Sequence, residues 1–523
     1  MEIEAVFAIA MFVAAIAALL AGYPVALTLG GVALLFAVVG SLLGVFPPLT
    51  FLRAFQDRIL GTMGNQVLVA VPLFVLMGVV LERSKVAEDL LHIASRLLAQ
   101  VRGGLALAVI LVGALLAAST GIVGATVITM TLIALPTMLR QGYDPKLASG
   151  VIAASGTLGQ IIPPSIVLIL LADAISTANQ QAGASLASGP TAVSVGDLFS
   201  GALIPGLLLV GVYLIYVVAN AMFRPSSCPP ATGAPDPIST REVVLGLGAP
   251  LLLIVAVLGS ILFGLASPTE ASSIGAGGAV LLAGLRLAPE NAPRMTWIIL
   301  AGVAGLVLML VLREVFDLRA SRDVIPVADA AAMAVAAVSA LTFFAGLAAG
   351  ARVLMASGRF EPALTSAVHI TAMVFLILIG ASLFALVFRG YGGDDLVTAA
   401  LTASPGGLWG ALALTMLVMF LLGFFLDFIE IVYVVVPLVA PPLIVLGADP
   451  VWLAILMALN LQTSFLTPPF GFALFYLRGA APASLETLDI WRGAIPFIGL
   501  QIGLILLVAF LPTLATWLPN LSR

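Results

Sequence analysis

The stretch GYDPKLASGVIAASGTLGQIIPPSIVLIL, residues Gly142–Leu170, decides the fold, because its pattern occurs a second time. The second copy is GADPVWLAILMALNLQTSFLTPPFGFALF, residues Gly447–Phe475, and the matched positions lie 305 residues apart. Both copies open with Gly-x-Asp-Pro and carry Pro-Pro inside an apolar run, and Pro136 recurs as Pro441. Chance matching of common residues would not keep these spacings free of gaps, so we infer an internal repeat.

The composition places both copies in a membrane. Of 523 residues, 62% are hydrophobic and 9% charged, and the mean hydropathy is +1.22. A spanning helix needs about 20 apolar residues, so the chain is predicted to be an all-α multi-pass protein. Soluble enzymes, nucleic-acid binders and disordered scaffolds are excluded, and the strand alternation of a membrane β-barrel is missing. The first apolar run is expected to span rather than to be a cleaved secretion signal, because Met1–Glu4 carries two acids and no base.

Charge placement predicts that the two copies have opposite orientations. Lys and Arg concentrate in cytoplasmic loops. Basic residues flank the first copy and lie in its turn (Arg140 and Lys146), whereas the turn of the second copy carries Asp449 and no base. Each copy also starts with two short runs that begin and end on one side, at 103–118 with 125–139 and at 407–424 with 431–446. Re-entrant hairpins fit these runs and leave about 12 crossings for the rest.

A charged segment, Glu82–Gly103, precedes the first hairpin. Apolar residues recur in it with helical period, which favours an amphipathic arm helix in the membrane interface. A solvated connecting helix fits equally well, and His92 is interpreted as a surface residue.

Four irregular elements are expected to meet near the midplane, since non-helical backbone at membrane depth must line a cavity. They are the two hairpin tips, at 119–124 and around Asp427, and the two breaks, at 155–165 and 460–471. Unwound carbonyls, hydroxyls and a carboxylate are oxygen ligands suited to a hard cation. New half-helices starting at the Pro-Pro pairs would offer amide donors to a carboxylate.

Two acids lie at the second tip, Asp427 and Glu430, and a buried acid in a span is a functional candidate. Asp427 is predicted to act in the site, whereas Glu430 is left open between the site and the scaffold side of the hairpin. The chain has no Walker-type loop, no His-Glu-x-x-His motif and no convincing Ser-His-Asp set, and one cysteine and two histidines offer little to zinc. An intramembrane enzyme is therefore the least favoured function.

Three stretches resemble the large membrane subunit, DctM type, of tripartite ATP-independent periplasmic (TRAP) transporters. They are Gly142–Leu170, SPTEASSIGAGGA at Ser267–Ala279 and Leu422–Gly479. The resemblance implies an elevator-type carrier with inverted repeats, two re-entrant hairpins and two broken helices. It also implies a small four-helix membrane subunit, a periplasmic substrate-binding protein, the bacterial inner membrane and no cofactor beyond sodium as coupling ion.

The resemblance implies two sets of site residues on the elements named above. The sodium set comprises Ser119, Thr120, Gly121, Gly156, Thr157, Gly159, Asp427, Asn460, Gln462, Thr463 and Thr467. The substrate set comprises Gly124, Pro163, Pro164, Ser165, Pro468 and Pro469. Because the tip Ser119-Thr120-Gly121 departs from the commoner Gly-Ser-Ser, the resemblance does not fix individual ligands.

The predicted organisation has five segments, and Ala288–Arg359 resembles an insertion with two extra spans. The segments are scaffold helices with the arm helix (1–102), the first repeat (103–197), scaffold helices containing the insertion at 288–359 (198–406), the second repeat (407–493) and a C-terminal helix (494–523).

The expected function is sodium-driven, binding-protein-dependent import of a small organic anion, such as a carboxylate. A stand-alone sodium- or proton-coupled symporter remains the alternative.

Overall fold

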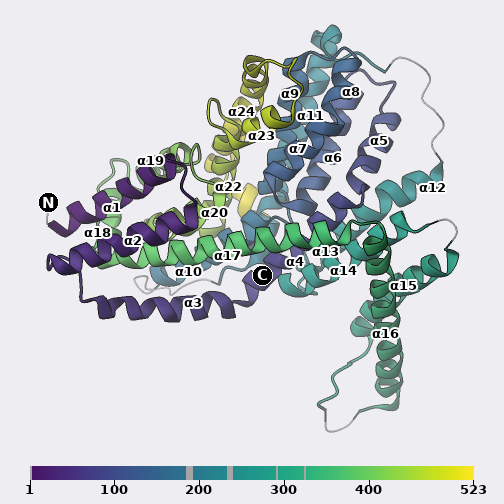
Figure 1. Cartoon of the computed structure of the whole chain (residues 1–523), viewed down its shortest axis with the longest axis horizontal. Coiled ribbons are helices and arrows are strands. Elements are labelled where there is room, and N and C mark those ends of the chain that lie inside the picture. The colour runs from purple at the N-terminus through teal and green to yellow at the C-terminus, as the bar shows by residue number, and fades with distance from the viewer. Residues whose placement is uncertain (1–2, 184–191, 232–238, 290–291, 323–324, 523) are drawn as a thin grey trace.

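A computed structural model describes residues 3–183, 192–231, 239–289, 292–322 and 325–522. This described part consists of helices and their connections and contains no strand (Figure 1). The predicted all-α fold class is confirmed.

The first repeat forms a hairpin followed by a broken helix. Its elements are α6 (Gly104–Thr120), α7 (Val123–Ile133), α8 (Leu135–Arg140), α9 (Pro145–Thr157), the 3₁₀ turn η2 (Leu158–Gln160) and α10 (Ile166–Gly183). Asp144 caps α9 by accepting the Lys146 N–H at 2.9 Å, ahead of a Pro at the first helical position. The polar loop predicted from residue 176 starts later, because α10 continues to Gly183.

The second repeat follows the same plan at the same offset. Its elements are α19 (Leu408–Leu422), α20 (Phe428–Glu430), the π-helical η5 (Ile431–Val435), α21 (Val436–Val445), α22 (Pro450–Leu466) and α23 (Phe472–Ala480). Asp449 caps α22 through the Trp452 N–H at 2.9 Å. The second limb of each hairpin begins at Val123 or Phe428, and the broken helices begin at Pro145 and Pro450. The members of each pair are 305 residues apart. The structure thus has the repeat predicted from the sequence.

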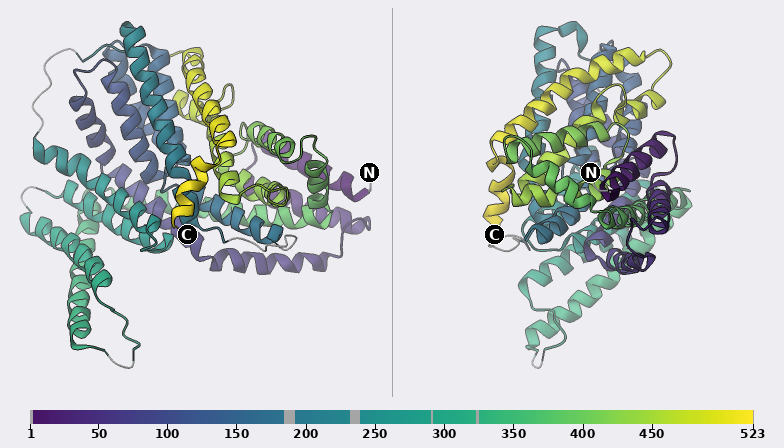
Figure 2. Two further views of the ribbon diagram at one scale, coloured as in Figure 1. Left: turned by 180° about the vertical axis from the view of Figure 1, so that it is seen from behind. Right: turned by 90° about the vertical axis from the view of Figure 1, so that its left-hand side faces the viewer.

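The remaining helices surround these repeats. Before the first repeat come α1 (Ile3–Leu20), α2 (Val25–Leu42), η1 (Leu49–Arg53), α3 (Ala54–Gly64), α4 (Gln66–Arg83) and α5 (Val86–Leu97). Between the repeats lie α11 (Val195–Phe223), η3 (Pro225–Ser227), α12 (Thr240–Val243), η4 (Val244–Gly248), α13 (Ala249–Leu262), α14 (Pro268–Leu287), α15 (Pro293–Val315), α16 (Val327–Ala356), α17 (Phe360–Gly390) and α18 (Gly393–Thr402). The chain closes with α24 (Thr487–Phe510) and α25 (Thr513–Ser522). The long α17 crosses α2 and α4 (Figures 1 and 2).

The arm helix α5 packs on protein with its apolar face. Leu90, Leu91 and Ala94 are buried, α5 contacts α6, and Asp89 pairs with Arg286 of α14. The sequence therefore correctly located an amphipathic helix. Its place in the membrane interface stays a prediction.

The predicted insertion forms a protruding helical pair, α15 and α16 (Figures 1 and 2). The two helices approach closely where a Cβ on Gly302 would lie 2.8 Å from the Cα of Gly346. In their connection Arg319 pairs with Asp317 at 2.6 Å, and its hydrogen bonds hold the pKa of Asp317 well below the ordinary range. Since the chain carries its basic residues here beside acids, the connection is close to neutral.

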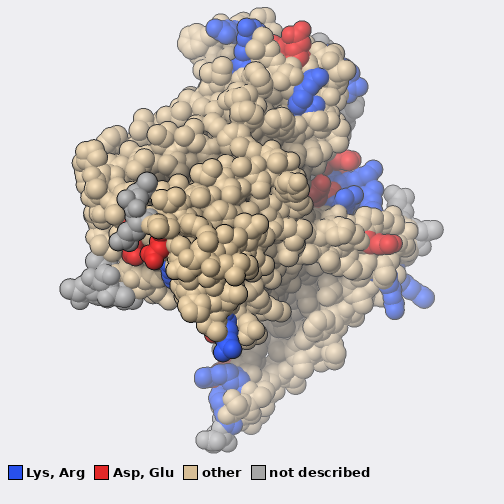
Figure 3. Space-filling view, turned by 60° about the vertical axis from the view of Figure 1, so that its left-hand side comes forward, with Lys and Arg blue, Asp and Glu red and all other residues tan. Residues whose placement is uncertain are grey.

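Ten described helices are long and apolar enough to cross a membrane. The first limb of each hairpin is shorter than these helices: α6 has 17 residues and α19 has 15. Figure 3 shows charged side chains gathered at the extremities of one face, separated by a broad uncharged surface. The chain is a multi-pass membrane protein, and the count of about 12 crossings stays a prediction.

Candidate functional site between the hairpin tips and helix breaks

The two repeats exchange their half-helices. The second half of the first broken helix, α10, packs against α21 of the second hairpin. Reciprocally, α23 packs against α7 of the first hairpin. This crosswise packing gives the pair a pseudo-two-fold arrangement and brings both tips and both breaks together in one region.

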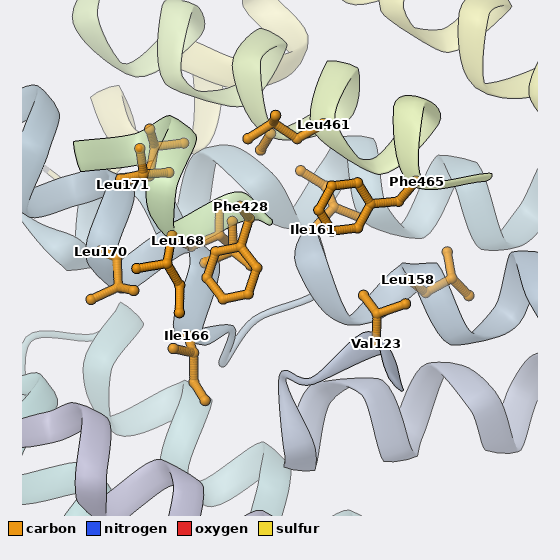
Figure 4. Packing of buried hydrophobic residues seen from close by; sticks show 14 of the residues in the cluster. Val123, Leu158, Ile161, Ile166, Leu168, Leu170, Leu171, Phe428, Leu461 and Phe465 are labelled. Atoms are coloured by element: carbon orange, nitrogen blue, oxygen red, sulfur yellow. The ribbon is translucent and has the colours of Figure 1, made fainter. Parts of the chain in front are cut away.

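The first tip rests on the first break. Gly121 has φ +60°, a conformation that favours glycine, and a Cβ there would lie 3.1 Å from both the backbone N and Cγ1 of Ile166. Figure 4 shows Val123 beside Leu158, and Phe428 of the second tip among residues of the first break and α10. Ser119 and Thr120 end α6, but their side chains lie outside the described residues.

The second half-helix α23 joins the two tips. A Cβ on Gly124 would lie 2.9 Å from the ring of Tyr476. Phe470, just before α23, packs against Phe425 near the second tip, with ring centroids 5.2 Å apart. The segment with Phe470 and Tyr476 therefore connects Gly124, predicted as a substrate contact, to the second tip.

The second tip begins with an acidic capping arrangement. Asp427 is the N-cap of α20 and accepts the Phe428 N–H at 2.8 Å, and Glu430 follows in the first turn of that helix. Glu430 is 3% exposed, and its Oε2 has no hydrogen-bond partner. Glu430 is thus buried with an unpartnered carboxylate oxygen, and its role in the site stays a hypothesis.

Two residues related by the repeat meet each other. Gln462 Nε2 donates to Thr157 Oγ1 at 3.3 Å, and these residues are 305 positions apart. Gln501 Nε2 lies 3.4 Å from the same oxygen and donates to the Tyr213 hydroxyl at 2.7 Å. The broken helices α9 and α22 are therefore joined at the pseudo-axis, and α24 and α11 are fastened to them there.

The second break is shorter than predicted. Asn460, Gln462 and Thr463 lie in the continuous helix α22, which reaches Leu466. Asn460 donates to the Met416 carbonyl at 2.8 Å, and Thr463 donates to the Leu459 carbonyl of its own helix at 2.8 Å. These polar groups are satisfied without unwinding the backbone, so polarity alone overestimated the break.

The first break also starts later than expected. Gly156 and Thr157 belong to α9, and Gly159 lies in η2. A Cβ on Gly156 would lie 2.3 Å from Val127 Cγ2, so this glycine serves close helix packing. Between η2 and α10, the residues outside helices are Ile161–Ser165.

The Pro-Pro pairs do not start the new half-helices. Pro163-Pro164 and Pro468-Pro469 form the turns, with cis bonds in both, and α10 and α23 begin at Ile166 and Phe472. The prediction that the Pro-Pro pairs form the first turns of the new half-helices was therefore wrong. Ser165 donates to the Gln160 carbonyl at 3.0 Å within the first break. Thr467 is the C-cap of α22 and donates to the Thr463 carbonyl at 2.7 Å.

The donor set of the region fits a hard cation. Among described residues, buried oxygens without a hydrogen-bond partner lie on η2, α19, α20, α22 and α24: Gln160 Oε1, Thr415 Oγ1, Glu430 Oε2, Gln462 Oε1 and Gln501 Oε1. The Thr463 hydroxyl donates to a backbone carbonyl, which leaves its oxygen lone pairs as acceptors, whereas the Thr157 oxygen already accepts from Gln462 and Gln501. Oxygen acceptors are what sodium requires, although Gln160 Nε2 also lacks a partner and would need water.

Asp173 is a functional candidate that the sequence analysis missed. It lies on α10, and it accepts hydrogen bonds from Asn65 Nδ2 at 2.7 Å and from the Tyr433 hydroxyl at 3.2 Å. A signal was present, since a lone acid on an apolar helix is a candidate by default. Tyr213, Tyr476 and Gln501 gave no sequence signal, because only tertiary packing brings them to the region.

This arrangement defines a multi-pass transport protein built from two repeats with hairpins and broken helices. The profile described as "Tripartite ATP-independent periplasmic transporter, DctM component" matches residues 12–312 and 286–514. The chain belongs to the DctM family, which confirms the predicted resemblance and makes it a transport protein rather than an enzyme. The two matched ranges overlap at the start of the α15–α16 pair.

Relatives support this assignment along the chain. The C4-dicarboxylate TRAP transporter large permease protein DctM of Vibrio cholerae is 28% identical, covering 98% of this chain and 97% of its own. The ectoine TRAP transporter large permease protein TeaC of Halomonas elongata is 25% identical, covering 87% and 86%. The isethionate TRAP transporter permease protein DctMQ of Oleidesulfovibrio alaskensis is 24% identical, covering 95% of this chain and 64% of its own.

A solved structure shares the fold. The YdaH transporter of Alcanivorax borkumensis, described as having an unusual topology, superposes with a TM-score of 0.50 at 16% identity. The match covers 88% of this chain and 87% of that one. At this identity the likeness concerns the fold alone.

Proposed function

We propose that the chain is the permease of a sodium-driven, binding-protein-dependent importer of a small organic anion, such as a carboxylate. The observations that carry the proposal are the unpartnered buried oxygens on the two repeats and on α24, together with the Asp427 carboxylate at the second tip. Sodium bound there would supply positive charge beside the acids. The chain's own residues would hold the tips against the half-helices, as Gly121 and Gly124 do here.

The moving body of an elevator mechanism would include more helices than the repeats. Tyr213 and Gln501 fasten α11 and α24 to Thr157 by buried hydrogen bonds. A Cβ on Gly150 would lie 2.1 Å from the Gly493 carbonyl, so α9 and α24 touch through backbone. We therefore assign α6–α11 and α19–α25 to the moving body and α1–α5 with α13–α18 to the scaffold. This assignment moves α11 and α24 out of their predicted segments.

The proposed partners are a small four-helix membrane subunit and a periplasmic substrate-binding protein. The name of the DctMQ relative, of which this chain covers 64%, supports association with a second membrane component. The inner membrane of a bacterium is where such large permeases work.

The test is uptake into proteoliposomes that contain all three components. An inward sodium gradient is expected to drive accumulation of the substrate that the binding protein carries. Equal uptake with potassium in place of sodium would contradict the coupling, and uptake by this chain alone would favour a stand-alone symporter.

A further inference from the structure

Helix α4 of the scaffold makes polar side-chain contacts with the moving body near both of its ends. At the start, Asn65 Nδ2 donates to Asp173 Oδ1 of α10 at 2.7 Å. At the end, Thr129 of α7 donates to Glu82 Oε1 at 3.3 Å. Since α4 rises 1.5 Å per residue, these contacts lie about 26 Å apart. They reach two different elements of the first repeat: α7 of the hairpin and α10, the second half of the broken helix.

The contact at Asn65 is oriented by helix capping. Asn65 is the N-cap of α4, and its Oδ1 accepts the Val67 N–H at 2.9 Å. That bond fixes the amide, so its Nδ2 is the group that faces Asp173. The other Asp173 oxygen accepts the Tyr433 hydroxyl of the second hairpin at 3.2 Å. Asp173 is thus held by the moving body and joined to the scaffold through one amide.

The rest of the interface is not directional in this way. Between its ends α4 contacts α6 and α10 of the moving body and α14 and α17 of the scaffold, and it carries buried apolar side chains such as Leu68, Phe74 and Val75. Apolar packing tolerates sliding, because its energy depends on area rather than on direction. A hydrogen bond to a carboxylate is lost once its atoms separate by an ångström or two.

We propose that Asn65–Asp173 and Glu82–Thr129 form a two-ended latch that stabilises this one position of the moving body against the scaffold. The inference rests on the proposed function, since it requires a body that moves. Any shift of α7 and α10 along α4 by more than a few ångström breaks both bonds together. The latch therefore biases the conformational equilibrium toward the arrangement described here.

The test measures the distance between spin labels at Leu42→Cys on α2 and Phe223→Cys on α11, both 82% exposed. The complete transporter in lipid nanodiscs is used, and Cys228 is buried and gives a background measured without the label pair. Asn65→Ser keeps a capping oxygen but is too short to reach Asp173, and Thr129→Val removes the other donor. Each is expected to lower the ratio of this arrangement to the displaced one about tenfold, and the double variant more.

Asp449→Ser is the matched control, because it also exchanges one capping residue for another at a helix whose cap stays within the moving body. Its distance distribution should equal that of the unmodified chain. If two distances are observed but neither Asn65→Ser nor Thr129→Val changes the ratio of their populations, the latch is overturned while the moving body is retained. A single distance under all sodium and substrate conditions would overturn the moving body and the latch with it.

Discussion

The two hairpin tips occupy equivalent places in the repeat but carry different chemistry. Where the first tip has Ile122 and Ala125, the second has Asp427 and Glu430, each pair 305 residues apart. The breaks differ as well: Pro163 and Pro164 are buried, whereas Pro469 and Phe470 at the second break are exposed. Backbone geometry is thus shared by the halves, while charge and access are concentrated in the second half. The difference teaches that the repeat supplies the framework and the second tip supplies the electrostatics.

Asp427→Asn tests this asymmetry with the largest expected effect. The amide keeps the shape of the side chain but removes the negative charge, so stimulation of uptake by sodium should disappear. The measurement is initial uptake as a function of sodium concentration in proteoliposomes. Asp449→Asn, at an acid that caps α22, should keep its sodium dependence. Normal sodium dependence of the Asp427 variant would remove this residue from the site.

Gly124→Ala tests the first tip, whose partner in the second repeat is Ile429. The new Cβ would meet the Tyr476 ring and push α7 away from α23. Such overpacking costs about 1–3 kcal/mol of stability, so the uptake rate should fall as the tip loses its position. Adding Tyr476→Ala should relieve the crowding and restore uptake to the level of Tyr476→Ala alone. Gly211→Ala on α11, where a Cβ meets no atom within 4 Å, is the control. An unchanged rate in Gly124→Ala would contradict close approach of the first tip to α23.

Thr157→Val tests the contact between repeat-related residues and should have the smallest effect on transport. The change leaves Gln462 Nε2 without its described acceptor in a fully buried position, at a cost of about 1–3 kcal/mol. Thermal unfolding in sodium-free buffer measures the loss. Thr463→Val removes only a hydroxyl that bonds its own helix and should destabilise less. Equal destabilisation by both variants would mean that the pseudo-axis contact adds no stability.

The sequence could predict the repeat and the turns because these depend on local chemistry. Asp-Pro caps, Pro-Pro interruptions and positive-φ glycines such as Gly142 and Gly447 act through their own backbone, so their spacing survives unchanged in the structure. The membrane class followed from composition. The family followed from three stretches that the matched profile later covered.

The lengths of the breaks could not be read in the same way. Asn460, Gln462 and Thr463 look like an interruption, but their polar atoms bond a neighbouring helix, a repeat partner and their own helix. The partners of Asn460 and Gln462 lie on other helices, so these two bonds are a tertiary property. Asp173 was missed for a related reason, because its partners Asn65 and Tyr433 are 108 and 260 residues away.

The most direct test of the central claim is a cryo-EM map of the complete transporter in sodium compared with one in potassium. The account predicts an additional density in sodium, coordinated by Asp427 and oxygens of the tips and breaks, together with tighter contact between the second tip and α10. Identical maps at a resolution that shows ordered water, with no sodium-specific density beside Asp427, would contradict it.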